Sequence, residues 1–192
     1  MSRVIRIAAL ALLILLLPGL GYLLYQLTYE FWWPVSFVEV AKERTKLIDG
    51  LESYQSVDEA QAWFAARSLT WQVVADNHLA PDDPRPPLSM YSVTIQEFSH
   101  LDCTGELTVT FMNNRLMSTI FYPNDLKTYL ERLVTREGIR FVADQKRPDI
   151  REATIAPHTR VWSYRDYQGR DYVAWADTRL EKEESIWTMR HA

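Results

Sequence analysis

The stretch ELTVTFMNNRLMSTIFY, residues 106–122, decides the fold of this chain. Two runs of alternating apolar and polar residues flank Asn113 and Asn114, and asparagine tolerates the positive φ angles of a two-residue primed turn. The stretch therefore predicts an antiparallel β-hairpin. Counting outward from the turn gives the expected cross-strand pairs, which are Phe111 with Leu116, Val109 with Ser118 and Leu107 with Ile120.

The residues on either side of this hairpin predict a sheet with a helix packed on it. Met90–Phe98 alternates with period two and predicts a half-buried strand, and Thr70–Ala75 predicts another. After the hairpin, apolar residues recur at helical spacing until Gly138; they are Leu126, Tyr129, Leu130, Leu133 and Val134. The predicted fold class is α+β, with an antiparallel sheet covered by amphipathic helices in a two-layer domain.

Two capping-box patterns predict helices before the sheet. Ser36 with Glu39 predicts a helix to about Asp49, and Ser56 with Glu59 predicts a second one. The apolar stripe of the first helix could pair two chains. Because that stripe is too short for a stable coiled coil, docking on its own domain is favoured over homodimerisation.

The last third of the chain predicts a strand meander. A short strand at Arg140–Ala143 is followed by a polar connector, residues 144–158, that could divide the domain. Gln168-Gly169 predicts a two-residue turn, which pairs Tyr164 with Val173 and Trp162 with Trp175, and Ser185–Met189 predicts a third strand. The sequence leaves open whether the meander and the hairpin share one sheet.

The N-terminal residues 1–29 predict a membrane-spanning signal anchor. Arg3 and Arg6 precede an uncharged, mostly aliphatic run that is long enough to cross a bilayer core of about 30 Å. Aromatic residues that suit the lipid headgroup region lie in the second half of the apolar run and in the juxtamembrane segment 30–35. They are Tyr22, Tyr25, Tyr29, Trp32 and Trp33. The positive-inside rule places the N-terminus in the cytoplasm and residues 36–192 across the membrane. Cleavage after Gly21 as a secretory signal is the alternative.

Charge and cysteine content limit the cellular compartments and the kinds of partner that fit this chain. The chain has 25 acidic and 21 basic residues, and every acidic residue follows the apolar run. An acidic exported domain disfavours nucleic acid as a partner. Cys103 is the single cysteine, so no intrachain disulfide can form. These features favour the inner membrane of a bacterial envelope, with a periplasmic or extracellular domain.

Candidate functional residues form two weak sets. His100 and Cys103 lie within four residues of each other and could serve a cysteine nucleophile, although a turn with a buried cysteine is the favoured explanation. Aromatic residues of the meander could bind a ligand or a partner, although a core role is favoured; they are Trp162, Tyr164, Trp175 and Trp187. The four histidines are scattered, and no phosphate-binding or dinucleotide motif is present, so we expect neither a metal nor a cofactor.

The pattern from Gly105 to Leu116 resembles the hairpin of small outer-membrane assembly lipoproteins of the BamE type, in which a helical pair precedes such a sheet. The chain departs from that pattern because no cysteine follows its apolar run and because it continues from Pro123 to Ala192. No residue roles are carried over from this resemblance.

The function that best fits these features is a non-enzymatic membrane-anchored envelope protein whose exported domain binds another envelope protein. A ligand-binding or sensor module is one alternative. An envelope hydrolase acting on peptide or glycan is another, since an enzyme is unsupported by any motif but is not excluded.

Overall fold

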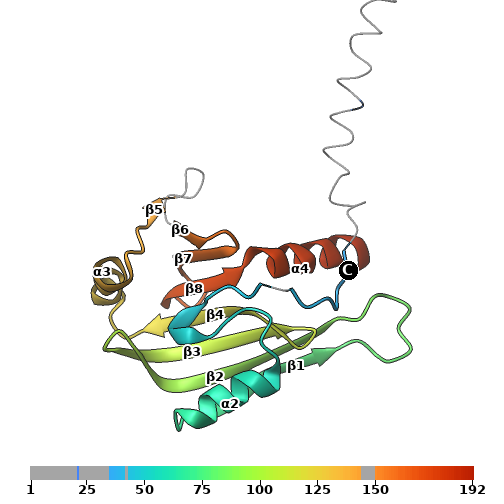
Figure 1. The fold of residues 1–192 in the computed structure, drawn as a ribbon, viewed down its shortest axis with the longest axis horizontal. Helices are drawn as coiled ribbons and strands as arrows, with labels where there is room; N and C mark the ends of the chain where they lie inside the picture. The colour runs from blue at the N-terminus through green and yellow to red at the C-terminus, as the bar shows by residue number, and fades with distance from the viewer. Residues whose placement is uncertain (1–20, 22–34, 42, 144–149) are drawn as a thin grey trace, which may run out of the picture. The chain divides into compact units, whose positions relative to one another are not determined.

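A computed structural model describes residues 21, 35–41, 43–143 and 150–192 of the chain. It shows an α+β fold in which eight antiparallel strands form one sheet, in the order β1-β2-β3-β4-β8-β7-β6-β5 (Figure 1). In chain order the described elements are the 3₁₀ turn η1 (Ile48–Gly50), α2 (Val57–Ala66), β1 (Trp71–His78), β2 (Ser89–His100), β3 (Cys103–Met112), β4 (Arg115–Pro123), α3 (Leu126–Glu137), β5 (Val142–Ala143), β6 (Arg151–Ala156), β7 (Thr159–Arg165), β8 (Asp171–Asp177) and α4 (Thr178–His191). The predicted α+β class with an antiparallel sheet is confirmed.

The β3–β4 hairpin forms around the predicted turn. Asn113 and Asn114 both have positive φ angles, and Phe111 lies opposite Leu116 as expected. A register shift follows that pair, so the two outer predicted pairs are wrong by one residue. The observed partners are Val109 with Thr119 and Leu107 with Phe121. A β-bulge adds one residue to one strand, and alternation alone does not reveal it.

The β7–β8 hairpin has a three-residue turn in place of the predicted two-residue turn. The backbone N–H of Asp166 donates to the carbonyl of Arg170, and Gly169 has φ 81°. A type I turn closed by a left-handed glycine is the usual three-residue hairpin. The predicted register is therefore wrong by one: Trp162 lies opposite Ala174, and Trp175 opposite Val161. Trp162 and Trp175 consequently lie on opposite faces of the sheet.

Helix α2 begins, and helix α3 ends, where the sequence predicts. At the start of α2 the Ser56 side chain accepts from the Glu59 backbone N–H, and the Glu59 carboxylate accepts from the Ser56 N–H. Asp125 caps α3 by accepting from the backbone N–H of Thr128, and Gly138 ends that helix in the left-handed conformation. Local capping chemistry contributes to both helix starts. At the start of α2 the distant Asn114 side chain also accepts, from the backbone N–H of Val57 at 2.9 Å.

The predicted helix from Ser36 to about Asp49 is wrong. Its described residues form no helix apart from η1, and Lys46 makes an isolated β-bridge with Glu52. Asn113 of the β3–β4 turn and Arg115 of β4 bind the carbonyls of Phe37 and Glu39. In a helix these carbonyls would accept bonds from residues four positions later. Leu47 and Ile48 are nevertheless buried, so the apolar pattern marked core positions and not a helix.

The predicted strand at Ser185–Met189 is also wrong, because these residues lie in α4. The helix begins next to Asp177, whose carboxylate accepts from the backbone N–H of Arg179. Glu and Lys residues that favour helices follow. The predicted connector 144–158 contains β6 within its described part, and β4 pairs with β8, so the hairpin and the C-terminal strands share one sheet.

One large core lies on one face of the sheet. Trp63 and Phe64 of α2 contact Phe98 and Trp71, while Tyr129 of α3 lies against Phe121. The core continues across the central strands; buried members are Val93, Ile95, Leu107, Val109, Val161, Val173 and Trp175. Alternation along each strand places the intervening polar side chains on the opposite face.

The contacts within the chain divide it into a unit of residues 36–184 and a unit of residues 1–35 with 185–192. Among the described residues, no helix is long and apolar enough to cross a membrane. Apart from Gly21 and Val35, the predicted anchor 1–29 and the juxtamembrane segment 30–35 lie outside the described residues. The predicted anchor residues outside them are Arg3, Arg6, Tyr22, Tyr25, Tyr29, Trp32 and Trp33.

Candidate functional site

His100 lies at the end of β2 and is held by α3 on both of its ring nitrogens. Its Nδ1 is 2.6 Å from the hydroxyl of Tyr129, and its Nε2 is 3.2 Å from Oε1 of Glu137. His100 is 6% exposed. Burial raises the pKa of the Tyr129 hydroxyl, and the nearby Glu137 carboxylate raises it further. Tyr129 therefore stays neutral and can donate its proton to the imidazole.

The turn between β2 and β3 is held by two arginines of the same helix. Arg132 donates to the carbonyl of Leu101 at 2.6 Å, and Arg136 pairs with Asp102 at 2.7 Å. The sulfur of Cys103 is buried and lies 3.5 Å from Nη1 of Arg132. Leu101 and Asp102 both have positive φ angles. Because a leucine in this conformation costs about 1–2 kcal/mol, the α3 contacts hold a strained turn in place.

These contacts bring the predicted pair His100 and Cys103 into one cluster, but as partners of α3. A nucleophile needs a free base beside it and space for the reacting group. Here both nitrogens of His100 already have partners, and the Cys103 thiol is 8% exposed. The arrangement suits a structural junction between helix and hairpin.

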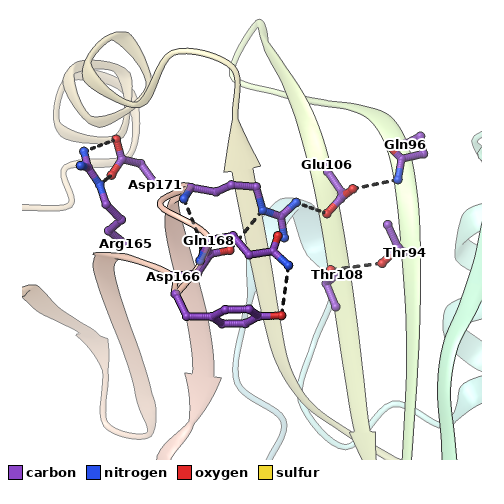
Figure 2. Close-up of polar contacts among 10 residues, drawn as sticks. Thr94, Gln96, Glu106, Thr108, Arg165, Asp166, Gln168 and Asp171 are labelled. Atoms are coloured by element: carbon purple, nitrogen blue, oxygen red, sulfur yellow. Dashed lines mark hydrogen bonds and ion pairs between the residues drawn. The ribbon is translucent and has the colours of Figure 1, made fainter.

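A second polar cluster lies on the sheet face opposite the large core. The hydroxyls of Thr94 and Thr108 are 3.2 Å apart, and the Gln96 amide donates to Glu106 at 2.8 Å. The other carboxylate oxygen of Glu106 is 3.1 Å from Nη1 of Arg170, which reaches across from the β7–β8 turn (Figure 2). Glu106 thus links Gln96 of β2 to Arg170 of the turn, and the Thr94–Thr108 pair joins β2 to β3 separately.

Asp166 braces the β7–β8 turn from within. Its carboxylate accepts from the backbone N–H groups of Gln168 and Arg170, both at 2.9 Å, and from Nε of Arg170 (Figure 2). Burial alone would raise the pKa of Asp166, but these hydrogen bonds outweigh it and the pKa is lowered. Tyr167 at the tip of the turn is 95% exposed. A rigid turn thus presents a tyrosine ring to solvent.

Three further tyrosines lie next to this turn. The guanidinium of Arg170 lies 4.0 Å from the ring centre of Tyr122. The rings of Tyr122 and Tyr172 are 5.7 Å apart, and those of Tyr172 and Tyr164 are 6.3 Å apart. We call the set of Tyr122, Tyr164, Tyr167, Arg170 and Tyr172 the turn surface.

Two pockets flank the turn surface. One, of about 710 Å³, is lined by residues that include Gln96, Glu106, Tyr122 and Arg170. The other, of about 1030 Å³, lies between α3 and the β7–β8 hairpin, and Tyr164 lines it. The turn surface therefore offers aromatic rings beside hollows that could receive side chains of a partner.

The four aromatic residues that the sequence predicted as binding candidates differ in their exposure to solvent. Trp175 is 1% exposed and Trp187 is 5% exposed, so neither is accessible to a ligand. Trp162 is half-buried beneath the guanidinium of Arg160, 4.4 Å from its ring centre. Of the four residues, Tyr164 alone belongs to the turn surface.

Sequence reasoning missed the other members of this surface, namely Tyr122, Tyr167, Arg170 and Tyr172, and the neighbouring Glu106. One signal was available around Gly169, because Arg165, Asp166, Arg170 and Asp171 flank the turn with matched charges. Arg165 and Asp171 indeed pair at 2.7 Å across the hairpin. The reach of Arg170 to Glu106 depends on sheet order and has no local signal.

Within the described part of the chain, no group of three or more His, Cys, Asp or Glu side chains is arranged to hold a metal ion. Comparison of the sequence with known protein families and with curated proteins gives no match.

Proposed function

We propose that this protein is a non-enzymatic, single-pass envelope protein of the inner membrane, whose exported domain binds another envelope protein through the turn surface. The observation that carries the proposal is the 95% exposure of Tyr167 on a turn braced by Asp166. Residues 1–29 serve as the anchor with the N-terminus in the cytoplasm, and residues 36–192 form the exported two-layer domain.

The chemistry of the turn surface supports a protein partner. Tyrosine and arginine are the residue types enriched in interface hot spots, and this surface consists of four tyrosines and Arg170. A tyrosine on a rigid turn loses little conformational entropy on binding because it has few rotatable bonds. Ring faces beside pockets suit contact with a partner's side chains more than contact with a small polar molecule.

The state of the chemically reactive residues supports a non-enzymatic role. His100 and Cys103 are buried and engaged by α3, which removes the most reactive cluster of the sequence from solvent. The carboxylates beside the turn surface are engaged as well, since Glu106 and Asp166 both bind Arg170.

Site-specific photo-crosslinking in intact cells tests this proposal. A photoreactive amino acid replaces Tyr167 in the full-length protein, and the matched control carries it at Val74, which is 58% exposed on β1 at the far end of the strand order. We expect a discrete adduct with one envelope protein from position 167 and none from position 74. Absence of an adduct from position 167, or equal adducts from both positions, would refute docking through the turn surface.

A further inference from the structure

A strap of irregular chain, residues 37–41 with Glu43, lies on the domain and is held by side chains. The Asn113 amide donates to the carbonyl of Phe37 at 2.7 Å. Arg115 donates from Nη2 to the same carbonyl at 2.7 Å and from Nη1 to the carbonyl of Glu39 at 2.9 Å. Since none of these donors comes from a helix or strand backbone, the strap is bound without belonging to the sheet.

Arg115 is 1% exposed, which is unusual for a guanidinium. Its remaining partners are the Met112 carbonyl and the Glu183 carboxylate of α4, with Nη1 of Arg115 2.9 Å from Oε2 of Glu183. A buried guanidinium needs acceptors for its five N–H groups, and the strap supplies two of those acceptors.

The side chains of the strap differ in burial. Phe37 is 8% exposed, and Ala41 packs against a small cluster formed by Tyr54, Met112, Met117 and Leu180. Val38 and Val40 are 61% and 56% exposed. At the far end, Arg179 donates to the carbonyl of Glu43 at 3.0 Å. The strap is therefore attached through polar contacts to its backbone carbonyls and through the burial of Phe37 and the packing of Ala41, while Val38 and Val40 are exposed.

We propose that Arg115 is a clasp that holds the strap on the domain, and that the strap opens while the sheet remains folded. Opening breaks no bond of the strand ladders, and water solvates the guanidinium as soon as the strap leaves. An apolar side chain at position 115 would instead be exposed to water when the strap is open, which would disfavour opening. The clasp is thus suited to reversible attachment.

Opening would change the reach of the domain. The strap follows the predicted membrane anchor in the sequence, and its seven positions, 37–43, extend to about 23 Å at roughly 3.3 Å per residue. Release of the strap would lengthen the tether between the anchor and the domain by up to that amount. This inference is independent of the partner proposed for the turn surface.

Distance measurement between two spin labels tests the clasp. The labels are placed on cysteines at Val40 and Val73, both more than half exposed, in full-length protein carrying Cys103→Ser. We expect one narrow distance distribution for the otherwise unchanged protein. Arg115→Lys cannot keep the two-pronged contact, so the population of a longer, broad component rises about tenfold for each hydrogen bond lost. Arg132→Lys is the matched control, because Arg132 holds the carbonyl of Leu101 and not the strap. It should leave the distribution narrow.

A narrow distribution in Arg115→Lys overturns the proposal, as does broadening accompanied by loss of tryptophan fluorescence from the core. A second measurement needs no change at position 115. In the labelled protein, low urea should broaden the distribution before the total tryptophan fluorescence changes. If both change at the same urea concentration, the strap does not open separately and the clasp is refuted.

Discussion

Replacement of Gly105 by alanine should destabilise the domain through a steric effect at one end of the β3–β4 pair. Gly105 lies opposite Pro123, and an added Cβ would stand 2.1 Å from the carbonyl oxygen of Tyr122. It would also stand 2.9 Å from Cε2 of Phe121 and 2.9 Å from Cα of Pro123. Two of these three neighbours are backbone atoms, which cannot swing aside as a side chain can.

The size of the effect follows from these distances. Real Cβ contacts are essentially never shorter than 3.0 Å, so the strands must separate by about 0.9 Å from the present 2.1 Å contact. A ladder hydrogen bond of about 2.9 Å would then exceed its working range. Losing one or two such bonds costs about 1 kcal/mol each, and crowding of Phe121 adds about 1–2 kcal/mol. We expect a total near 3 kcal/mol, or a fall in Tm of about 6–12 °C.

The assay is urea and thermal unfolding of the full-length protein in detergent, followed by tryptophan fluorescence. Gly169→Ala is the matched control, because Gly169 has φ 81° but no atom within 4 Å of the added Cβ. That control carries only the cost of a left-handed alanine, about 1 kcal/mol. If Gly105→Ala costs no more than Gly169→Ala, steric crowding between β3 and β4 is not what requires glycine here.

Two further substitutions test the buried polar contacts. Burial raises the pKa of Glu183 above 4.5, so the stability that this group contributes is complete below pH 4.5 and is lost as pH rises. Glu183→Gln should therefore have a higher Tm than the parent at pH 8, with the difference disappearing towards pH 4; a lower Tm at pH 8 would contradict this sign. Tyr129→Phe removes the hydroxyl that lies 2.6 Å from Nδ1 of His100 and should cost about 1–2 kcal/mol in urea unfolding. A cost below about 0.5 kcal/mol would mean that water replaces the hydroxyl.

Local sequence patterns predicted the elements that depend on local physics. The turn at Asn113-Asn114 requires two positive φ angles, and both residues adopt them. The capping box at Ser56 and the left-handed glycine at Gly138 likewise act within a few residues of the chain. For this reason α2, α3 and the central hairpin were predictable from sequence.

The strap shows where local patterns fail. Ser36 and Glu39 carry the same capping signature as Ser56 and Glu59, yet no helix forms among the described residues between 36 and 47. Arg115 and Asn113 bind carbonyls that a helix would use internally. The competing partners lie more than seventy positions away in the sequence, so no window around Ser36 contains them.

The sequence by itself determined the α+β class, the hairpin turn, the capped helices and the apolar positions of the core, because these depend on side-chain period and on backbone preferences of single residues. Tertiary structure alone decided the pairing of β4 with β8, the removal of His100 and Cys103 from solvent, and the meeting of Glu106 with Arg170. Each of these joins segments whose contact follows from strand order. Strand order is set by the packing of the whole core and not by any one stretch of the chain.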